Sequence, residues 1–335
     1  MAKDYSSIVV SSRVRLSRCL NDVPFPAKMD ELTGKKVVRK VYNAIDGEDD
    51  FGLYVMKDLP RDEAYIMQEK HLISHDLIEN SQSGAVMINQ DETISIMINE
   101  EDHIREQCLM SGLCLEQAYQ KLNKIDQQIC KKIDIAFDQN LGFLTSCITN
   151  VGTGLRVSVM LFLPALTLTK KIDSIIGNLT KNGLAVRGAY GEATDYLGYL
   201  YQISNERTIG KSEEDYIRQI NSIIIQICDM EIDARKQLLL TRETEVKDVV
   251  GRAYGVLTNC YLLPVEEFMR LAGEIKMGIA LNLVRMKDNH IVDKLLATLA
   301  PYTLCKLAGN VSTMQEEQKF RAEYVAKVLK SNRIK

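Results

Sequence analysis

The sequence lacks a strong excess of charge of either sign. Its 42 lysines and arginines are balanced by 45 aspartates and glutamates, which leaves a formal net charge of -3 at pH 7. A protein that binds nucleic acid non-specifically through phosphate contacts needs a positive field over its surface. We therefore expect no direct nucleic-acid partner, and any phosphate chemistry must be local.

Long hydrophobic runs are also missing. The longest uncharged apolar stretch, residues 157–169, contains Pro164 and is well short of the roughly 20 apolar residues that span a bilayer. The first ten residues hold one run of three apolar residues and no cationic leader, so they predict no secretory signal. We expect a cytoplasmic protein without a membrane partner.

The eight cysteines form no C-x-x-C pair and have no histidine at metal-ligand spacing beside them. This pattern predicts reduced thiols and no zinc or other protein-bound metal. Most of these cysteines are interpreted as small core side chains. Cys147 is treated separately below.

The common nucleotide-binding signatures are absent. There is no G-x-x-x-x-G-K-[ST] phosphate loop, and the glycine-rich loop of protein kinases with its H-R-D and D-F-G motifs is absent too. There is also no internal repeat. The common nucleotide folds are therefore disfavoured.

What is present is the composition of an ordinary globular protein of one large or two domains, with 335 residues, 46% hydrophobic and 26% charged. The first two-thirds mix short strands with helices, whereas the last hundred residues show helical periodicity. A boundary is expected at residues 225–245.

Hydrophobic periodicity and turn residues predict the individual elements. Ser212 and Asp215 are typical of a capping box that opens a helix. The other expected elements are strands at 51–56, 184–187 and 199–204, a hairpin of 84–88 with 93–98, and an amphipathic helix over 115–137.

The Gly152-Thr153-Gly154 turn is expected to lead from an extended segment, residues 142–150, into a helix that runs through Leu168. The N-terminus of such a helix would hold a phosphate. By itself the turn is weak support, since such glycines usually serve backbone geometry.

Five arginines stand where a strand is expected to end or a glycine-rich turn to begin: Arg13, Arg15, Arg105, Arg156 and Arg187. Guanidinium groups match the geometry of phosphate oxygens. If the five converge, they form a cationic cradle for a nucleoside triphosphate. Taken singly, each one is better interpreted as a solvated surface arginine, and spacing alone does not establish that the five converge.

The stretch Asn99-Glu100-Glu101-Asp102-His103 places three carboxylates beside an imidazole. One interpretation is an exposed acidic loop. The other is a carboxylate that receives a cationic substrate, with Glu192 in its glycine-rich loop as a second one.

Four segments in this order resemble the guanidino-kinase (phosphagen kinase) superfamily: Ser11–Arg15, Asn99–Arg105, Cys147–Arg156 and Arg187–Glu192. Within it, the chain is similar to the bacterial protein-arginine kinase (McsB) family. That similarity includes Glu69–Ser74, Gln202–Asn205 and Gly210–Glu213, and it extends over nearly the whole chain.

The resemblance implies an α+β fold, an antiparallel sheet flanked by helices, for a guanidino-kinase catalytic domain at residues 1–230. A helical C-terminal domain at 231–335 would dock substrate and form a dimer. Creatine and arginine kinases place a helical domain before the first motif, and it helps to enclose the small substrate. Here that motif begins at Ser11, so an open acceptor site, suited to arginine within a polypeptide, is expected.

The resemblance also assigns a nucleotide site for ATP with Mg²⁺. Mg²⁺ would bridge the phosphates largely through water, so no protein metal ligand is expected. The nucleotide-binding residues carried over are Ser11, Ser12, Arg13, Val14, Arg15, His71, Arg105, Arg156, Val157, Ser158, Val159, Met160, Arg187, Gly188, Ala189, Tyr190 and Gly191.

The catalytic residues implied are Glu101, Glu192 and Cys147. The two carboxylates would clamp the acceptor guanidinium, with Glu101 as the base. Cys147, as a thiolate, would add negative charge toward the acceptor, and nearby arginines favour that thiolate. No covalent phosphocysteine is required.

Two positions depart from the family pattern. The residue after Cys147 is usually proline and here is Ile148, a change expected to leave activity intact. Related kinases have a C-terminal Arg-Asp-x-x-Arg-Ala pocket that binds phosphoarginine, whereas this chain has Glu317-Gln318-Lys319-Phe320-Arg321-Ala322. Glu317 would repel a phosphoryl group, so a surface helix with solvated charges is predicted there.

The function implied is ATP-dependent phosphorylation of protein arginines, which in this family tags proteins for Clp-type proteolysis during stress and protein quality control. The partners implied are proteins with exposed arginine, an activator of the McsA type, a Clp unfoldase and a second copy of the chain. Two alternatives stay open, a kinase for free arginine or another guanidino metabolite and a non-catalytic adaptor.

Overall fold

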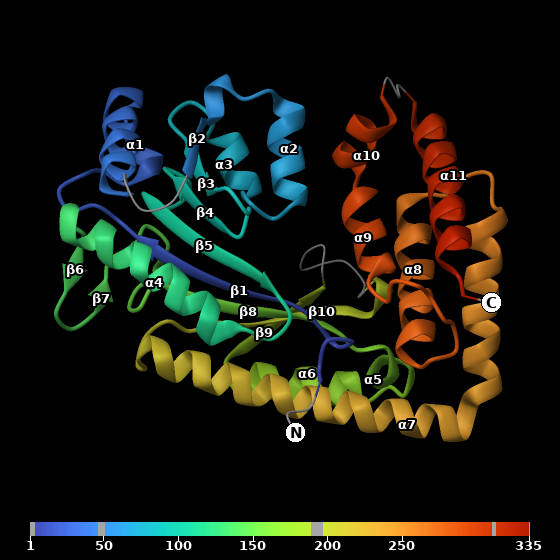
Figure 1. Cartoon of the computed structure of the whole chain (residues 1–335). Helices are drawn as coiled ribbons and strands as arrows, with labels where there is room; N and C mark the ends of the chain where they lie inside the picture. Colours follow the sequence, from blue (N-terminus) through green and yellow to red (C-terminus); the bar gives the residue numbers. More distant parts are fainter. Residues whose placement is uncertain (1–3, 46–50, 189–196, 310–312, 335) are drawn as a thin grey trace. The chain divides into compact units, whose positions relative to one another are not determined.

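One eight-stranded sheet organises the structure, in the order β2-β3-β4-β5-β1-β8-β10-β9 (Figure 1). The computed structural model describes residues 4–45, 51–188, 197–309 and 313–334. The strands of the sheet are β1 (Val9–Arg18), β2 (Phe51–Val55), β3 (Ala85–Asn89), β4 (Ile94–Ile98), β5 (Ile104–Ser111), β8 (Leu155–Phe162), β9 (Leu184–Gly188) and β10 (Leu200–Asn205). A separate pair is formed by β6 (Phe137–Asp138) and β7 (Gly142–Phe143).

Helices flank this sheet and make up most of the C-terminal third. The α-helices are α1 (Glu31–Ile45), α2 (Arg61–Glu69), α3 (His75–Glu79), α4 (Leu115–Lys132), α5 (Pro164–Leu168), α6 (Ile172–Lys181), α7 (Glu213–Asn259), α8 (Val265–Ala280), α9 (Ile291–Thr298), α10 (Pro301–Ala308) and α11 (Met314–Asn332). The 3-10 turns are η1 (Pro26–Lys28), η2 (Met56–Asp58), η3 (Ile148–Asn150) and η4 (Leu197–Tyr199).

The chain divides into two compact units that interleave along the sequence. The first comprises Met1–Met160, Asn178–Val186 and Ile203–Ile225, and the second Leu161–Gly177, Arg187–Gln202 and Gln226–Lys335. Helix α7 is interrupted at Arg242, whose φ of -137° is not helical. The fold class predicted from the sequence, an antiparallel sheet flanked by helices with a helical C-terminal region, is confirmed.

Most of the predicted elements are present, including the β3–β4 hairpin and the strands β2, β9 and β10. The hydroxyl of Ser212 accepts a hydrogen bond from the backbone N–H of Asp215 at 3.1 Å, as expected at the start of α7. The amphipathic helix ends at Lys132 rather than Phe137, because Phe137 belongs to β6.

The helix predicted after Gly154 is wrong, because residues 155–162 form strand β8. Val157 and Val159 are fully buried, and β-branched side chains pack well on a pleated surface. Only α5, which begins at Pro164, is helical. The phosphate site expected at a helix N-terminus therefore does not exist at this turn.

The Gly152 turn is fixed by a close backbone approach. Its φ is +111°, and a Cβ there would lie 2.4 Å from the carbonyl oxygen of Thr208. The backbone N–H of Thr153 also donates to that carbonyl, at 2.9 Å. Glycine is required at this position because both the conformation and the space exclude a side chain.

The pleat of β1 separates its side chains onto two faces of the sheet. Strand β1 pairs antiparallel with β5, so that Arg15 lies opposite Gln107 and Leu16 opposite Glu106. Alternate residues point to opposite faces. Arg13 and Arg15 therefore share one face, while Val14, Leu16 and Arg18 share the other.

Helix α4 covers the face that carries Arg18, which is 1% exposed. Arg18 makes a bidentate ion pair with Asp126 of α4, with N···O distances of 2.9 and 2.8 Å, and its Nη1 donates to the carbonyl of Thr153 at 2.9 Å. Its guanidinium carbon lies 3.6 Å from the centre of the Phe143 ring. This ion pair connects β1, α4 and the turn that precedes β8.

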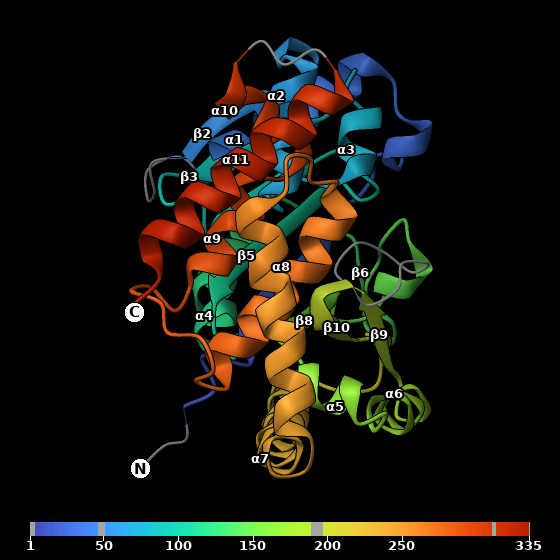
Figure 2. The ribbon, with the colours of Figure 1, turned by 90° about the vertical axis from the view of Figure 1, so that its right-hand side faces the viewer.

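The second unit has its own hydrophobic core, built from the C-terminal part of α7 and from α8, α9, α10 and α11 (Figures 1 and 2). Among the described residues, no helix combines the length and apolar character that crossing a bilayer requires.

The interpretation of residues 317–322 as a helix with solvated charges is wrong for Arg321. This side chain is 2% exposed, and its Nη1 donates to the carbonyl of Leu263 at 2.9 Å. Burial lowers the pKa of Arg321. The sequence pattern missed this because Arg321 fills a position on the inner face of α11, beside buried Ala322 and Val325.

Glu106 generates a prediction about stability. Its carboxyl is fully buried, and burial together with the charge of Asp126 raises its pKa well above the usual range, although Arg18 opposes this. A raised folded-state pKa means that wild-type stability is lost as pH rises from about 4.5 through the folded value. We expect Glu106→Gln, which mimics the protonated carboxyl, to raise the free energy of unfolding by about 1–2 kcal/mol at pH 8 and to change it little at pH 5. Urea unfolding at both pH values measures this, and an equal effect at both would contradict it.

Candidate active site

The face of the sheet opposite α4 carries a group of four arginines on three neighbouring strands. Arg13 and Arg15 lie on β1, Arg105 on β5 opposite Ser17, and Arg156 on β8. The Nε of Arg13 donates to the hydroxyl of Ser158 at 3.3 Å, which places Ser158 of β8 on the same face. We call Arg13, Arg15, Arg105 and Arg156 the arginine cradle.

The like charges of the cradle act on one another. Burial, with the charges of Arg105 and Arg156, lowers the pKa of Arg13 to about 10. Burial and the charges of the other three arginines lower the pKa of Arg15 well below its usual value. The Nε of Arg15 has no hydrogen-bond partner among the described residues. Such a concentration of buried cations is relieved by a bound polyanion.

The sequence analysis placed these arginines where a strand ends or a glycine-rich turn begins. This is wrong for Arg13 and Arg15, which lie inside β1, whereas Arg105 and Arg156 are the second residues of β5 and β8. The antiparallel register brings them together, because residues far apart in the chain become neighbours across adjacent strands.

Glu100 contacts the cradle directly, although the sequence analysis gave it no role of its own. It is 1% exposed, and its Oε1 accepts from Arg105 Nη1 at 2.5 Å and from the hydroxyl of Ser74. Burial raises its pKa, but the ion pair with Arg105 outweighs this, so the net pKa of Glu100 is lowered. Glu100 therefore orients Arg105 and is itself enclosed.

His71 lies at the edge of the cradle. Its backbone has a φ of +60°, and its carbonyl accepts from the side-chain amide of Gln107 at 2.6 Å. Burial of the ring and the charge of Arg13 lower the pKa of His71, although part of the residue is open to solvent. His71 therefore lies close enough to Arg13 for the charge of that arginine to act on its ring.

The acidic stretch forms the tight loop between β4 and β5, closed by a hydrogen bond from the N–H of Asn99 to the carbonyl of His103 at 3.0 Å. Glu101 alone of its three carboxylates is exposed. Burial lowers the pKa of Arg105, but the charge and hydrogen bond of Glu100 and, after them, the charge of Glu101 raise it, and the net pKa is raised. An exposed carboxylate therefore lies beside a buried guanidinium of the cradle.

Asp102 and His103 are structural rather than reactive. His103 is fully buried, with Nδ1 accepting from the N–H of Leu20 at 3.2 Å and Nε2 lying 3.0 Å from the carbonyl oxygen of Pro24. The imidazole beside the carboxylates is thus part of the core.

The Cys147 loop is tied to the acidic loop by Asp102. The carboxylate of Asp102 accepts from the N–H of Ser146 at 2.7 Å and from the amide of Asn150 at 3.1 Å. Cys147 Sγ lies 3.1 Å from the hydroxyl of Thr149 and is partly accessible. Because Asp102 and Ser146 are directly bonded, their neighbours Glu101 and Cys147 belong to one local region.

Ile148, at the position where proline is usual, is 85% exposed. Its side chain therefore contributes little to the loop. That the change to Ile148 leaves activity intact stays a prediction.

The pleat divides the predicted nucleotide-binding residues of β1 and β8 between the two faces of the sheet. Ser11, Ser158 and Met160 lie on the cradle face by the alternation of their strands. The fully buried side chains of Ser12, Val14, Val157 and Val159 point to the opposite face. Ser12, for example, donates to the carbonyl of Gly112 at 2.7 Å. These four can approach a ligand on the cradle face only through their backbone.

Arg187 and Gly188 close strand β9 at the edge of the sheet, with Arg187 half-buried and Gly188 buried. Ala189, Tyr190, Gly191 and the predicted catalytic residue Glu192 lie outside the described residues.

Asn205 at the end of β10 is a further supporting residue that the sequence analysis did not single out. Its side-chain oxygen accepts from the N–H of Val157 at 2.7 Å, and its Nδ2 donates to the carbonyl of Leu155 at 2.9 Å. These bonds hold the backbone on both sides of Arg156.

The described residues fit a polyphosphate better than a bare metal ion. No group of three or more His, Cys, Asp or Glu able to hold a metal occurs in the described part of the chain. Arginine forks bind phosphate oxygens directly. A magnesium ion here would be held mainly by phosphate oxygens and water, which fits this donor set.

Residues 33–234 match the family described as ATP:guanido phosphotransferase, C-terminal catalytic domain. Residues 243–335 match the Protein-arginine kinase McsB C-terminal domain. The chain is 43% identical over 324 residues to the protein-arginine kinase of Caldanaerobacter subterraneus subsp. tengcongensis, covering 95% of this chain and 96% of that protein. It is 42% identical over 320 residues to the protein-arginine kinase of Halothermothrix orenii, covering 95% and 92%.

Two solved structures are similar in fold. Lombricine kinase matches with a TM-score of 0.60 and 27% identity over 70% of this chain and 67% of that one. The duplicated taurocyamine kinase of Schistosoma mansoni, crystallised with transition-state analogue components, matches with a TM-score of 0.64 and 22% identity over 93% and 48%. At that identity the second match supports the fold alone.

The repulsion between the cradle arginines predicts what happens when one of their charges is removed. We expect Arg15→Met to raise the free energy of unfolding without ligand by about 1–3 kcal/mol, because a buried like charge is removed. The same change should weaken Mg-ATP binding about 10- to 100-fold. Thermal unfolding with and without Mg-ATP measures both effects. Arg39→Met, on the exposed side of α1, is the control and should change neither; a lower unliganded stability for Arg15→Met would contradict the prediction.

Proposed function

The chain belongs to the protein-arginine kinase family of the ATP:guanidino phosphotransferases, and we propose that it transfers the γ-phosphoryl group of ATP to arginine side chains of proteins. The observation that carries this proposal is the position of exposed Glu101 beside the arginine cradle. The cradle suits a polyphosphate, and the carboxylate suits a cationic acceptor.

The cradle arginines act on the donor. In phosphoryl transfer the charge is spread over the oxygens of the transferred group, and catalysis depends on positioning and electrostatic stabilisation. Arg13, Arg15, Arg105 and Arg156 lie on a rigid sheet, and Glu100 already fixes the direction of Arg105. Arg187 is proposed to join them. These residues need little reorganisation when the phosphates bind.

The carboxylates act on the acceptor. A guanidinium has a pKa above about 12 and is a poor nucleophile while it carries its proton. Glu101 and Glu192 are proposed to hold one nitrogen in line with the γ-phosphorus. Glu101 accepts the proton as the N–P bond forms and the bond between the γ-phosphorus and the ADP oxygen breaks. Cys147, as a thiolate, adds negative charge that attracts the guanidinium.

Mg²⁺ bound with ATP would neutralise charge on the phosphate oxygens. The chain's own contribution is the set of arginines that receives the remaining negative charge. Ser11, Ser158 and His71 are proposed to line the same nucleotide site.

The proposed division of labour assigns catalysis to residues 1–230 and substrate docking and homodimer formation to residues 231–335. The match of residues 243–335 to the McsB C-terminal domain supports this. We further propose that the product serves as a tag for Clp-type proteolysis in the cytoplasm under stress, with an activator of the McsA type.

The test is incubation of the purified chain with Mg-ATP and an arginine-rich unstructured protein, in parallel with free arginine. Mass spectrometry under non-acidic conditions preserves the labile N–P bond. Phosphoarginine on the protein supports the proposal. Product on free arginine alone would indicate a metabolite kinase instead, and ATP binding without any product would indicate an adaptor or a missing activator.

Glu101→Ala is expected to abolish transfer, because the base and one half of the acceptor clamp are removed. ATP affinity should stay within about twofold, since Glu100 rather than Glu101 holds Arg105. Mass spectrometry of the product measures transfer, and calorimetry measures ATP binding. Glu192→Ala is expected to abolish transfer and to keep ATP affinity in the same way. Glu116→Ala, which removes an exposed carboxylate of α4, is the control. Unchanged turnover in Glu101→Ala would reject the assigned base.

Cys147→Ser is expected to slow transfer about 3- to 10-fold at saturating ATP, because a neutral hydroxyl replaces the negative charge near the acceptor. The rate is compared with that of Cys130→Ser, an exposed thiol on α4. Equal rates for the two variants would exclude a contribution from Cys147.

A further inference from the structure

Strand β2 forms one edge of the eight-stranded sheet (Figure 1). In the described part of the chain it pairs with β3 alone, so its other side carries backbone N–H and C=O groups without a strand partner. Its side chains are apolar and open to solvent, with Leu53 36%, Tyr54 39% and Val55 38% exposed. An exposed apolar edge of this kind can pair with another extended chain.

Strand β2 lacks the features that usually prevent such pairing. Edge strands commonly carry lysine or proline, contain a bulge, or direct a charge inward. The residues Phe51–Val55 include no charge and no proline, and their register with β3 is unbroken. The ring of Tyr54 lies against Gly52, because a Cβ at Gly52 would be 3.1 Å from Cε2 of that ring. The edge is therefore apolar over its whole length.

The register of the sheet places this edge in line with the arginine cradle. Tyr54 lies opposite Val86 of β3. Val86 lies opposite Met97 of β4, and Met97 lies opposite Arg105 of β5. Directly opposed residues of antiparallel strands point to the same face. Tyr54 is therefore on the cradle face, within the same compact unit as Arg105.

Hydrogen bonds connect the end of β2 to the loop that carries Glu101. The N–H of Met56, which follows β2, donates to the carbonyl of Gly84 at 3.0 Å. The side-chain amide of Asn99 donates to the carbonyl of the adjacent Ser83 at 2.8 Å. Asn99 begins the loop in which Glu101 is exposed. The end of β2 and the exposed carboxylate thus lie at the same end of the sheet.

The distance between the edge and this loop suits a short stretch of polypeptide. Neighbouring strands are about 4.8 Å apart, so an extended segment paired with β2 would lie about 14 Å from β4. Strand β4 leads directly into the loop of Glu101. An extended chain advances about 3.3 Å per residue, so about four to six residues cover this distance.

The charge at this end of β2 suits a cationic acceptor. The two cations that follow the strand, Lys57 and Arg61, are each paired with a glutamate. Asp58 and Asp62 beside them are exposed and form no ion pair with any described residue. Together with Glu101 they leave negative charge where an arginine-bearing segment would pass.

We propose that the free edge of β2 binds an extended apolar segment of the acceptor protein, about four to six residues from the arginine that is phosphorylated. The proposal rests on the proposed function and narrows its substrate class to unfolded or unstructured segments. Only such segments expose the backbone groups that pair with an edge strand, because a folded protein has these groups paired already.

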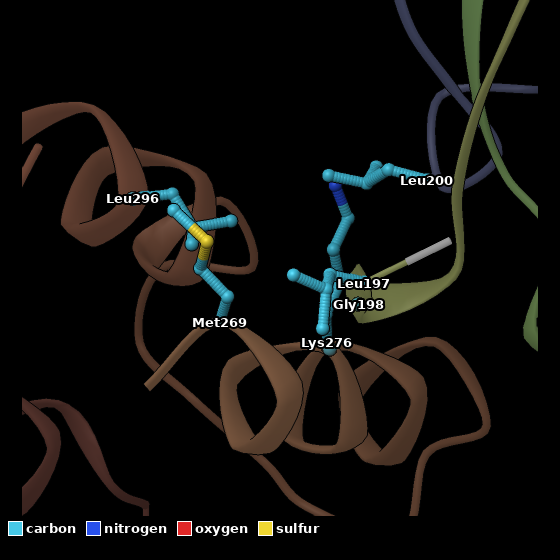
Figure 3. A pocket seen from close by; sticks show the side chains of 7 residues that line it. Leu197, Gly198, Leu200, Met269, Lys276 and Leu296 are labelled. Carbon is cyan, nitrogen blue, oxygen red and sulfur yellow. The ribbon is translucent and has the colours of Figure 1, made fainter. Parts of the chain in front are cut away.

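A second apolar feature, in the other compact unit, is a small hollow lined by Leu197, Leu200, Met269 and Leu296. Figure 3 shows Lys276 extending from α8 toward Leu200, with Met269 and Leu296 on the other side of the hollow. Of the lining residues only Leu200 lies in a strand, and that strand, β10, has β8 and β9 on its two sides. The hollow therefore offers no strand edge and provides a control.

The first test compares two unstructured acceptor peptides with the full wild-type chain and Mg-ATP. One carries an alternating apolar segment five residues from its single arginine, and the other has proline at every second position of that segment. Proline removes the N–H that pairs with a strand. We expect KM to be about 10-fold lower for the apolar acceptor and kcat to agree within about twofold, because the segment binds away from the reacting atoms. Equal KM values would overturn the proposal.

The second test is Leu53→Lys, which adds a charge to the edge and so disfavours pairing. It should raise KM for the apolar acceptor about 10-fold and change KM for the proline acceptor less than about twofold. Leu240→Lys, at an 86% exposed leucine of α7, is the control for the added charge. Met269→Ala is the control for the hollow. A raised KM in Met269→Ala together with a wild-type KM in Leu53→Lys would reject the proposal. The peptide comparison stands even if Leu53→Lys does not fold.

Binding without catalysis separates this proposal from the proposed function. A fluorescent copy of the apolar acceptor with lysine in place of its arginine should bind the wild-type chain about 10-fold more tightly than Leu53→Lys, by anisotropy. If the wild-type chain binds this peptide but forms no phosphoarginine on protein, the proposed function fails alone. If Leu53→Lys lowers the mass of the chain in solution by light scattering and leaves the peptide affinity unchanged, β2 pairs two copies of the chain and the proposal is wrong.

Discussion

The mutual repulsion of four half-buried arginines on one face of the sheet is the constraint on which the rest of the site depends. Burial and like charge lower the pKa values of Arg13 and Arg15. The unliganded protein therefore holds a destabilising concentration of positive charge. It persists because the strands that carry the arginines are fixed elsewhere, and a bound triphosphate relieves the repulsion. The same repulsion that lowers the stability of the unliganded protein therefore favours binding of the triphosphate.

Contacts on the opposite face of the sheet hold these strands in place. Arg18 is on the same strand as Arg13 and Arg15, but an odd number of residues away from both, so it points toward α4. There it pairs with Asp126 and holds the carbonyl of Thr153, just ahead of the strand that carries Arg156. Strand β1 thus carries Arg13 and Arg15, which repel each other, and Arg18, whose ion pair stabilises the fold. The pleat places them on opposite faces of the sheet.

The acidic loop divides three consecutive carboxylates among three tasks. Glu100 is buried and orients Arg105, Asp102 is buried and holds the Cys147 loop, and Glu101 remains exposed. The loop is closed by the bond between Asn99 and His103, so its side chains cannot exchange these positions. Glu100 and Asp102 therefore fix the residues that surround the exposed carboxylate of Glu101.

The sequence by itself determined the class of fold and the helical C-terminal region, because hydrophobic periodicity and ordered motifs are local properties. It did not determine that the arginines converge, that Val14 and Val157 face away from them, or that residues 155–162 form a strand. It also missed the burial of Arg321 and the position of β2 at the exposed edge of the sheet. These features depend on strand register and on packing between residues distant in the chain, so only the tertiary structure decided them.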